Sequence, residues 1–367
     1  MIIDCHTHVF QRWNGPCGHE STEIHWKYIQ KNVTRPAAKA RRLRDGAPAD
    51  AQALFRAGDN TWAGLRDDVR FRVGPFGGLE YTLEGEDYCV QYMPVGMAEI
   101  QAPPELQLAQ MSYAGVDHSV LQAGMSYGVM NDYNAFAQQQ YPDKFTGLFH
   151  VDEPMADTPR WMQELDRARH RLGLRGMYYQ LEGFARYGFS WRFEDARFDR
   201  FWEAVAALRV PVFFEASSMP DYDEKSYIAN MVGLDRLLTR FPSVRWLLVM
   251  GPPVGFFGRT GRWQFPEEVD RTYRRENLQL EIMFPITWGG VWDYPYPEAQ
   301  ALIKDLRDRY GAQKLVWGSD MPNVERFCTY RQCLDYVRRY CEFLTAREKE
   351  LVLGDNAAEL CGIRQAA

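Results

Sequence analysis

Long apolar runs, basic runs and paired cysteines are all missing from this sequence. No apolar stretch approaches the ~20 residues that a membrane-spanning helix requires, so no such helix is expected. The net charge is −6 and no long basic run is present, so a nucleic-acid or membrane-surface partner has no electrostatic support. The first residues do not show the basic, apolar and small-residue succession of a signal peptide. We therefore expect neither nucleic acid nor a membrane among the partners.

The cysteines argue against a disulfide framework. There are seven of them, an odd number, and no two are spaced as C-x-x-C. Disulfides persist in oxidising compartments, whereas free thiols are typical of a reducing cytoplasm. Cys328, Cys333 and Cys341 fall in a helical pattern, where packing is the expected role. We predict free thiols and a cytoplasmic location.

A regular alternation of strands and helices begins near residue 105. With 367 residues, 46% of them hydrophobic, the chain can form one large barrel domain with an insertion. The predicted strands are short and apolar, as a parallel sheet buried on both faces requires. They lie at 1–3, 117–122, 145–151, 174–180, 210–215, 244–250, 278–284 and 314–319. Helices are predicted between them at 105–113, 131–140, 156–172, 198–208, 228–241, 267–274 and 298–310. Eight such units predict an α/β fold, a (β/α)8 TIM barrel with its chemistry at the carboxyl ends of the strands.

Residues 11–104 interrupt this pattern as a long insertion after the first strand, within a single domain over 1–367. Ser21 is a helix cap, and the helix is predicted to run to about Val33. A short basic helical piece is predicted over 37–45, and a hairpin over 79–83 and 88–92. The insertion is rich in aromatic residues, so we expect an ordered lid or cap over the barrel mouth. A packing or dimerisation patch is the alternative.

Polar side chains stand at the predicted strand ends. His6 and His8 lie two residues apart and therefore on one face of the first strand, which makes half of a metal site. Further candidates at strand ends are His150, Glu215, Glu281 and Asp320. Because an unpaired buried carboxylate is costly, the three acids require a cation, and a divalent metal beside the two histidines is one solution. For Glu281 the alternative is a buried salt bridge with Arg175 or Arg245.

Several motifs together resemble the amidohydrolase superfamily. They are Ile-Ile-Asp-Cys-His-Thr-His at the start, Gly115-Val-Asp, Asn131 with Tyr141-Pro-Asp-Lys-Phe, Leu208-Arg-Val-Pro-Val, Trp317-Gly-Ser-Asp-Met-Pro and Gly354-Asp-Asn-Ala-Ala. Their order is similar to that of the branch that includes aminocarboxymuconate semialdehyde decarboxylase, resorcylate decarboxylases and related hydrolases. The resemblance covers residues 1–8 and roughly 105–363. The segment between them is the variable part.

The resemblance implies one divalent metal at the barrel mouth, with His6, His8 and Asp320 in the site. It also implies a histidine at the end of strand five and another at the end of strand six. Neither is present, because all seven histidines precede residue 171, and Glu215 and Met250 stand there instead. A glutamate can replace a histidine ligand, so we predict a site of His6, His8, Glu215 and Asp320 for zinc, with manganese or iron as alternatives.

Methionine cannot take a proton, so another residue must carry protons. Asp320 is the first candidate, and Glu281 and His150 are the others. Arg259 and Arg262 are candidate clamps for a substrate carboxylate, or solvated loop residues. Trp288, together with two neighbouring aromatic residues, is a candidate pocket wall or a loop anchor.

Three functions remain open at this stage. The main prediction is a metal-dependent hydrolase that acts on a small aromatic-derived or ring-cleavage carboxylate. A non-oxidative decarboxylase is the first alternative, because the resemblance covers enzymes of both kinds. A barrel that has lost catalysis and binds a ligand is the second. The family also suggests a homodimer.

Overall fold

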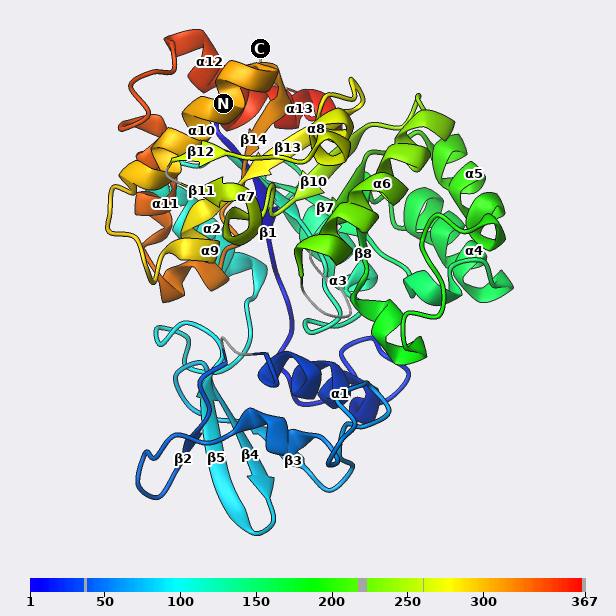
Figure 1. Cartoon of the computed structure of the whole chain (residues 1–367), viewed down its shortest axis with the longest axis vertical. Helices are drawn as coiled ribbons and strands as arrows, with labels where there is room; N and C mark the ends of the chain where they lie inside the picture. The colour runs from blue at the N-terminus through cyan, green and yellow to red at the C-terminus, as the bar shows by residue number, and fades with distance from the viewer. Residues whose placement is uncertain (36–37, 217–222, 260, 365–367) are drawn as a thin grey trace.

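Eight parallel strands form the central sheet of the computed structural model (Figure 1), in the order β1-β6-β7-β8-β9-β10-β13-β14. The structure describes residues 1–35, 38–216, 223–259 and 261–364. The strands are β1 Ile3–Thr7, β6 His118–Leu121, β7 Phe145–Phe149, β8 Gly176–Gln180, β9 Val212–Glu215, β10 Trp246–Val249, β13 Leu278–Ile282 and β14 Leu315–Trp317. Seven of them agree with the predicted strands to within a few residues. The first differs, because it was predicted over 1–3 and β1 runs from Ile3 to Thr7. The α/β barrel is confirmed.

Backbone contacts beyond the end of β14 nearly close the ring onto β1. The amide of Asp320 donates to the carbonyl of His6 at 2.8 Å, and the amide of His8 donates to the carbonyl of Met321 at 2.8 Å. Thr7 and Met321 form an isolated parallel bridge. The seam therefore lies where the predicted metal ligands stand.

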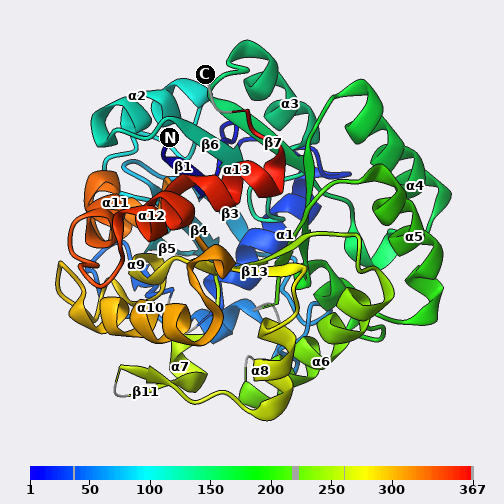
Figure 2. The same cartoon turned by 90° about the horizontal axis from the view of Figure 1, so that it is seen from above.

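Helices surround the barrel, as the view in Figure 2 shows. The long ones are α2 Pro104–Ala114, α3 Asn131–Gln140, α4 Pro159–Asp166, α5 Asp199–Leu208, α6 Glu224–Arg240, α8 Glu267–Tyr273, α10 Pro297–Tyr310 and α11 Tyr330–Arg338. Four short helices are α7 Val254–Phe257, α9 Phe284–Trp288, α12 Ala346–Glu350 and α13 Asn356–Cys361. The helix predicted over 156–172 is α4 followed by one π turn, η3 Arg167–Arg171. In Figure 2, α12 and α13 cross the end of the barrel where the strands begin.

Alternation along the strands divides the buried residues into two clusters. On β9, Val212 and Phe214 belong to the cluster that packs against the helices, whereas Phe213 belongs to a second cluster. That second cluster holds inward-facing residues of other strands, such as Leu148 and Val316, together with residues of the insertion. Apolar packing thus continues from the barrel interior into the inserted segment.

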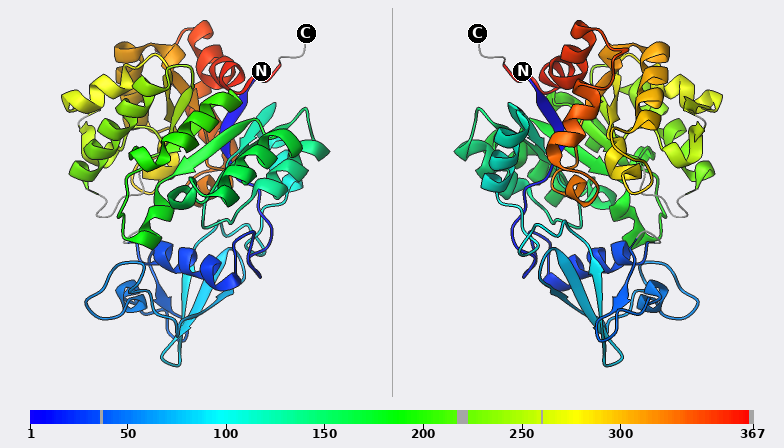
Figure 3. Two further views of the ribbon diagram at one scale, coloured as in Figure 1. Left: turned by 90° about the vertical axis from the view of Figure 1, so that its right-hand side faces the viewer. Right: turned by 90° about the vertical axis from the view of Figure 1, so that its left-hand side faces the viewer.

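The insertion folds as a helix and a small antiparallel sheet. It contains α1 Thr22–Val33, β2 Arg41–Arg42, β3 Arg70–Val73, β4 Gly78–Leu83 and β5 Glu86–Gln91, with sheet order β2-β5-β4-β3. Figures 1 and 3 place it at the end of the barrel toward which β1 runs. Because all eight strands are parallel, this is the end that carries the predicted site residues.

Two of the three local predictions for the insertion are confirmed. Ser21 caps α1, since its side chain accepts the amide of Ile24 at 3.2 Å, and the hairpin is β4–β5. The helical piece over 37–45 is wrong, and its first residue lies outside the described part. Arg41 and Arg42 pair with β5 as the edge of the sheet, and a turn follows in which Asp45 accepts from Arg42. Sheet pairing outweighs the local helical pattern here.

The seven cysteines are free thiols, as predicted. Within the described part of the chain, no helix combines the length and apolar character needed to cross a membrane.

Candidate metal centre

His6, His8 and Asp320 meet at the seam between β1 and β14. The Nε2 atoms of His6 and His8 are 3.1 Å apart. Oδ1 of Asp320 lies 2.9 Å from Nε2 of His8 and 3.7 Å from Nε2 of His6. All three residues are buried. Three possible ligand atoms, from elements at opposite ends of the chain, therefore face one point.

Their spacing fits ligands of a single ion. Two ligands at about 2.0–2.2 Å from one metal, with an angle near 90–110°, are separated by about 2.8–3.6 Å. The three distances measured between these atoms, 2.9, 3.1 and 3.7 Å, lie close to this range. Two imidazoles and a carboxylate are also a common donor set for divalent metals. The donor set fits a divalent metal.

The titration behaviour of His6, His8 and Asp320 reflects burial and the charged groups around them. Burial lowers the pKa of His6, but the charge and hydrogen bond of Glu281, together with the charges of Asp320 and Asp4, outweigh this effect and raise the pKa to about 9. Burial lowers the pKa of His8. Burial raises the pKa of Asp320, yet the hydrogen bond from His8 and the neighbouring charges hold this pKa below its usual value. A carboxylate and a neutral imidazole are the forms that ligate a metal.

Glu281 lies behind His6 rather than in the three-donor group. Both of its carboxylate oxygens are 3.1 Å from Nδ1 of His6. Its other donors are the thiol of Cys5, at 3.2 Å, and the amide of Met250, at 2.5 Å. Among the described residues its ion pair is with His6, so the predicted alternative of a salt bridge to Arg175 or Arg245 is wrong.

Asp4 supports β1 from beneath the site. Its carboxylate accepts from the amide and hydroxyl of Ser319, the hydroxyl of Tyr330 and the amide of His6. Burial raises the pKa of Asp4 to about 6, against the opposing effect of these donors. The network ties β1, the residues that follow β14, and α11 together beside the three-donor group.

Two residues near the site were missed by the sequence reasoning. The ring of Tyr127 lies 4.4 Å from that of His8 between centroids. The amide nitrogen of Asn323 donates to Oδ1 of Asp320 at 3.1 Å and also contacts the hydroxyl of Tyr127. Asn323 directly follows the motif, three residues after Asp320, and this spacing is the only sequence signal for a role beside Asp320.

The comparison with protein families decides the assignment. The family model described as Amidohydrolase matches residues 3–363. The chain belongs to the amidohydrolase family. The resemblance inferred from the motifs is confirmed, and the family and the three-donor site together support a divalent metal. No curated protein matches the sequence.

Solved structures of low sequence identity share the amidohydrolase barrel. A putative 2-pyrone-4,6-dicarboxylic acid hydrolase from Pseudomonas putida is 19% identical, with TM-score 0.56, covering 73% of this chain and 90% of its own. A probable hydrolase of the same kind from Acinetobacter baumannii, with citric acid bound, is 18% identical, with TM-score 0.52 and coverages of 72% and 90%. A 2,6-dihydroxybenzoate decarboxylase from Rhizobium is 14% identical, with TM-score 0.52 and coverages of 70% and 87%. These likenesses concern the fold.

Glu215 ends β9 outside the three-donor group. Its Oε2 is 3.4 Å from the hydroxyl of Tyr178, which donates to it. Its role as a fourth ligand stays a prediction.

Met250 adopts a left-handed backbone, with φ 61°, and so does Asp320, with φ 62°. Such backbone conformations are uncommon outside glycine and often occur at functional sites.

His150 follows β7 and is fully buried. Neither of its ring nitrogens has a hydrogen-bond partner among the described residues, and burial lowers its pKa to about 4. The backbone of His150 is held by Asn131 through two bonds of 2.9 and 3.0 Å. Its role as a proton carrier stays a prediction.

The predicted substrate clamps lie in and near a hairpin beside α10. Arg259 is in β11 Gly258–Arg259, and its side chain lies outside the described part of the structure. Arg262 is exposed in β12 Arg262–Trp263. Trp288 stacks on Trp292 at 5.6 Å between centroids. Within the described part of the chain, neither Arg262 nor Trp288 forms a hydrogen bond, ion pair or ring contact with the three-donor group, so their roles stay predictions.

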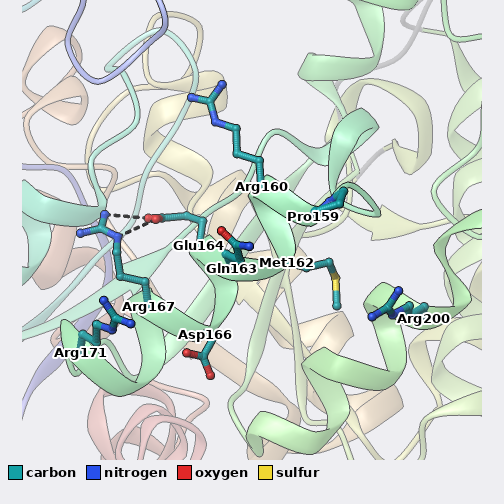
Figure 4. A pocket seen from close by; sticks show the side chains of 9 residues that line it. All are labelled: Pro159, Arg160, Met162, Gln163, Glu164, Asp166, Arg167, Arg171 and Arg200. Carbon is teal, nitrogen blue, oxygen red and sulfur yellow. Dashed lines mark hydrogen bonds and ion pairs between the residues drawn. The ribbon is translucent and has the colours of Figure 1, made fainter.

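Figure 4 shows a surface cavity of about 580 Å³ beside α4. Arginines dominate its lining: Arg160, Arg167, Arg171 and Arg200. Arg167 is neutralised by Glu164 and Asp132. None of the predicted site residues lines this cavity.

Proposed function

We propose that this protein is a metal-dependent hydrolase that acts on a small aromatic-derived or ring-cleavage carboxylate. The observation that carries the proposal is the meeting of His6, His8 and Asp320 at ligand spacing in an amidohydrolase barrel. Zinc is the proposed metal, with manganese or iron as alternatives. A bound divalent metal would polarise a substrate carbonyl and lower the pKa of a coordinated water toward ~7.

The chain itself supplies ligands and a proton acceptor. His6 and His8 would hold the metal through Nε2, and Asp320 through Oδ1. The hydrogen bonds of Asp320 to His8 and Asn323 both use Oδ1. We therefore assign proton transfer to Oδ2, the oxygen that those bonds leave available. Asn323 and Tyr127 would fix the carboxylate in this orientation.

Aromatic side chains on one side of the site suit a flat substrate. Tyr127 stacks on Phe10 at 4.9 Å and lies 6.3 Å from Trp13, which in turn contacts Tyr92 at 5.3 Å. Phe10 follows β1, Trp13 and Tyr92 belong to the insertion, and Tyr127 lies in the β6–α3 connection. By their names, the hydrolases among the structural relatives act on a pyrone dicarboxylate and the decarboxylase on a dihydroxybenzoate, which supports a small conjugated carboxylate as substrate class.

A decarboxylase of the same family is the second candidate. The structural relatives include both kinds of enzyme on the same barrel. Hydrolysis needs a water next to the metal and a base to deprotonate it, whereas decarboxylation needs a proton delivered to carbon. Asp320 could serve either reaction.

Metal analysis followed by a substrate comparison tests the proposal. We expect about one divalent ion per purified chain, lost in a His6→Ala/His8→Ala variant and retained in His170→Ala, which removes an exposed histidine. The metal-loaded protein is then assayed with 2-pyrone-4,6-dicarboxylate and with 2,6-dihydroxybenzoate. Ring opening supports the hydrolase, and release of carbon dioxide supports the decarboxylase. A chain that takes up no metal would contradict the proposal and favour a ligand-binding barrel.

Four further predictions belong to this proposal. Glu215 is proposed as a fourth ligand, and Glu215→Gln should then lower metal content without lowering the melting temperature. The insertion is proposed as a lid over the mouth. A cytoplasmic location and a homodimer are also proposed, the latter to be tested by sedimentation.

A further inference from the structure

We infer that Glu281 is a positioning residue for His6, rather than a proton carrier. The inference rests on the metal site proposed above, because it concerns the orientation of one of its ligands. It replaces the role predicted for Glu281 from the sequence. The carboxylate holds the imidazole by Nδ1, so that Nε2 faces His8 and Asp320.

A carboxylate beside Nδ1 dictates which nitrogen carries a proton. An ionised carboxylate only accepts hydrogen bonds, so Nδ1 of His6 must donate to it. Nδ1 keeps its proton whether or not Nε2 is protonated. Once Nε2 is deprotonated, its lone pair points at the proposed metal. Partners of this kind fix the tautomer and the ring orientation of metal-binding histidines.

The path between the two side chains depends on a glycine. Glu281 is on β13 and His6 on β1, and β14 lies between these strands. Gly318 directly follows β14, and a Cβ there would lie 2.3 Å from Oε1 of Glu281 and 2.8 Å from Cβ of His6. The missing side chain on the intervening strand lets the carboxylate reach the imidazole.

The end of β10, the sixth strand of the barrel, contributes to this contact through its backbone. The amide of Met250 donates to Oε2 of Glu281 at 2.5 Å, and the left-handed conformation of Met250 presents that amide. The thiol of Cys5 donates to Oε1 at 3.2 Å. Met250 stands at the position where the family resemblance implies a histidine. Its backbone amide binds Glu281, and Glu281 in turn holds His6 on the first strand.

Glutamine cannot replace Glu281 in these surroundings. Oε1 is approached by Cys5 and His6, and Oε2 by Met250 and His6, and all of these are donors. In either orientation of the glutamine amide, its NH2 group would face two of these donors, and no acceptor would stand there. Glu281→Gln keeps the size of the side chain and removes this set of bonds.

The test compares Glu281→Gln with Glu276→Gln, the same chemical change at an exposed residue just before β13. Zinc affinity is measured by chelator competition, and the imidazole N–H signals by NMR of metal-free protein labelled with ¹⁵N-histidine. We expect Glu281→Gln to bind zinc roughly 10–100-fold more weakly and to lose the His6 Nδ1–H signal. Glu276→Gln should match the parent in both measurements. Glu281→Asp, which keeps the charge at a greater distance, provides a milder variant if the glutamine variant does not fold.

The two readouts separate this inference from the metal proposal. Zinc affinity within twofold of the parent, together with an unchanged Nδ1–H signal, would overturn the positioning role. If the parent itself takes up no metal, the proposed function fails and the NMR signal alone decides. Loss of that signal in Glu281→Gln would then still support the positioning of His6 by Glu281.

Discussion

Asp320 has two carboxylate oxygens with different surroundings. Oδ1 binds His8 and Asn323, and Oδ2 is the oxygen to which we assign proton transfer. An asparagine at this position would keep an oxygen ligand but could not accept a proton. We therefore expect Asp320→Asn to lower kcat by about 10²–10⁴-fold, the usual contribution of a positioned acid or base. The assay is run with excess metal, and the metal content is measured in parallel.

The control for this variant is Asp305→Asn. Asp305 also accepts hydrogen bonds, from Trp263 and Arg309, but far from the three-donor group along the outer helix α10. It should leave kcat unchanged. Near-parental turnover of metal-loaded Asp320→Asn would place the proton carrier elsewhere and make His150 the next candidate.

His150 should make the folded protein sensitive to acid. Its pKa is lowered by burial to about 4, whereas an unfolded histidine titrates near pH 6.5. Between these values the unfolded chain binds the extra proton, so the free energy of unfolding falls as the pH drops below about 6.5. At pH 5 this effect amounts to about 2 kcal/mol.

The measurement is denaturant unfolding of the parent and of His150→Leu at pH 7.5 and pH 5. The parent should lose about 2 kcal/mol more than the variant between the two conditions. Equal losses in both proteins would show that His150 titrates normally in the folded state. At pH 7 a neutral His150 carries a proton on one ring nitrogen and a lone pair that can accept a proton on the other.

At this scale, the sequence predicted the three residues that meet at the seam better than it predicted their partners. The two-residue period of a strand was enough to place His6 and His8 on one face, and Asp320 stood at another strand end. The contact of Glu281 with His6 could not be predicted, because it crosses β14 at Gly318 and depends on barrel closure. The left-handed backbones of Asp320 and Met250 had no local signal either.

Among the elements, α11 links helix stability to the site. Its first residue, Tyr330, donates to Asp4 at 2.7 Å, and its cap Thr329 forms a reciprocal capping box with Gln332. Thr329→Ala should lower the free energy of unfolding by about 1 kcal/mol, the usual effect of losing such a cap. It should also weaken metal binding, because Asp4 supports the strand that carries both histidines.

Helix α12 offers a matched control for that change. Thr345 makes the same capping box, with Glu348, on a helix that has no buried residues. Thr345→Ala should lower the stability by a similar or smaller amount and leave metal affinity unchanged. Denaturant unfolding and metal titration of the two variants check both statements. Equal metal affinity in the two variants would show that α11 does not influence metal binding.

Elements of the barrel were predictable because each strand is a short apolar run between helices. The strands of the insertion were harder to predict. Its helix has a cap and its hairpin a clear turn, but β2 and β3 are short, polar and held by pairing with β5 and β4. Local pattern alone favoured a helix over 37–45, and only the partner strand shows otherwise.

At the scale of the whole molecule, the insertion brings a cation to the barrel mouth. Nη2 of Arg35, just after α1, lies 3.2 Å from Oε1 of Glu182, which stands two residues after the end of β8. Glu182 is buried, and the neighbouring charge of Glu215 contributes to its raised pKa, after the larger effect of burial. Arg35 thus links the insertion to the barrel through an ion pair. Sequence reasoning missed it because neither its place above the mouth nor its partner has a local signal.

If the insertion is a lid that recognises a carboxylate, Arg35 is the residue to test. Arg35→Gln removes the forked cation but keeps a polar side chain of similar reach. Because the Arg35 side chain is 57% exposed, we expect little change in melting temperature. The value of kcat/KM for a carboxylate substrate should fall at least about tenfold, which corresponds to a loss of about 1.4 kcal/mol in binding of the transition state. Arg44→Gln is the control, since Arg44 is similarly exposed and pairs with Glu86 inside the insertion. If metal-loaded Arg35→Gln has the kcat/KM of the parent, Arg35 does not bind the substrate carboxylate.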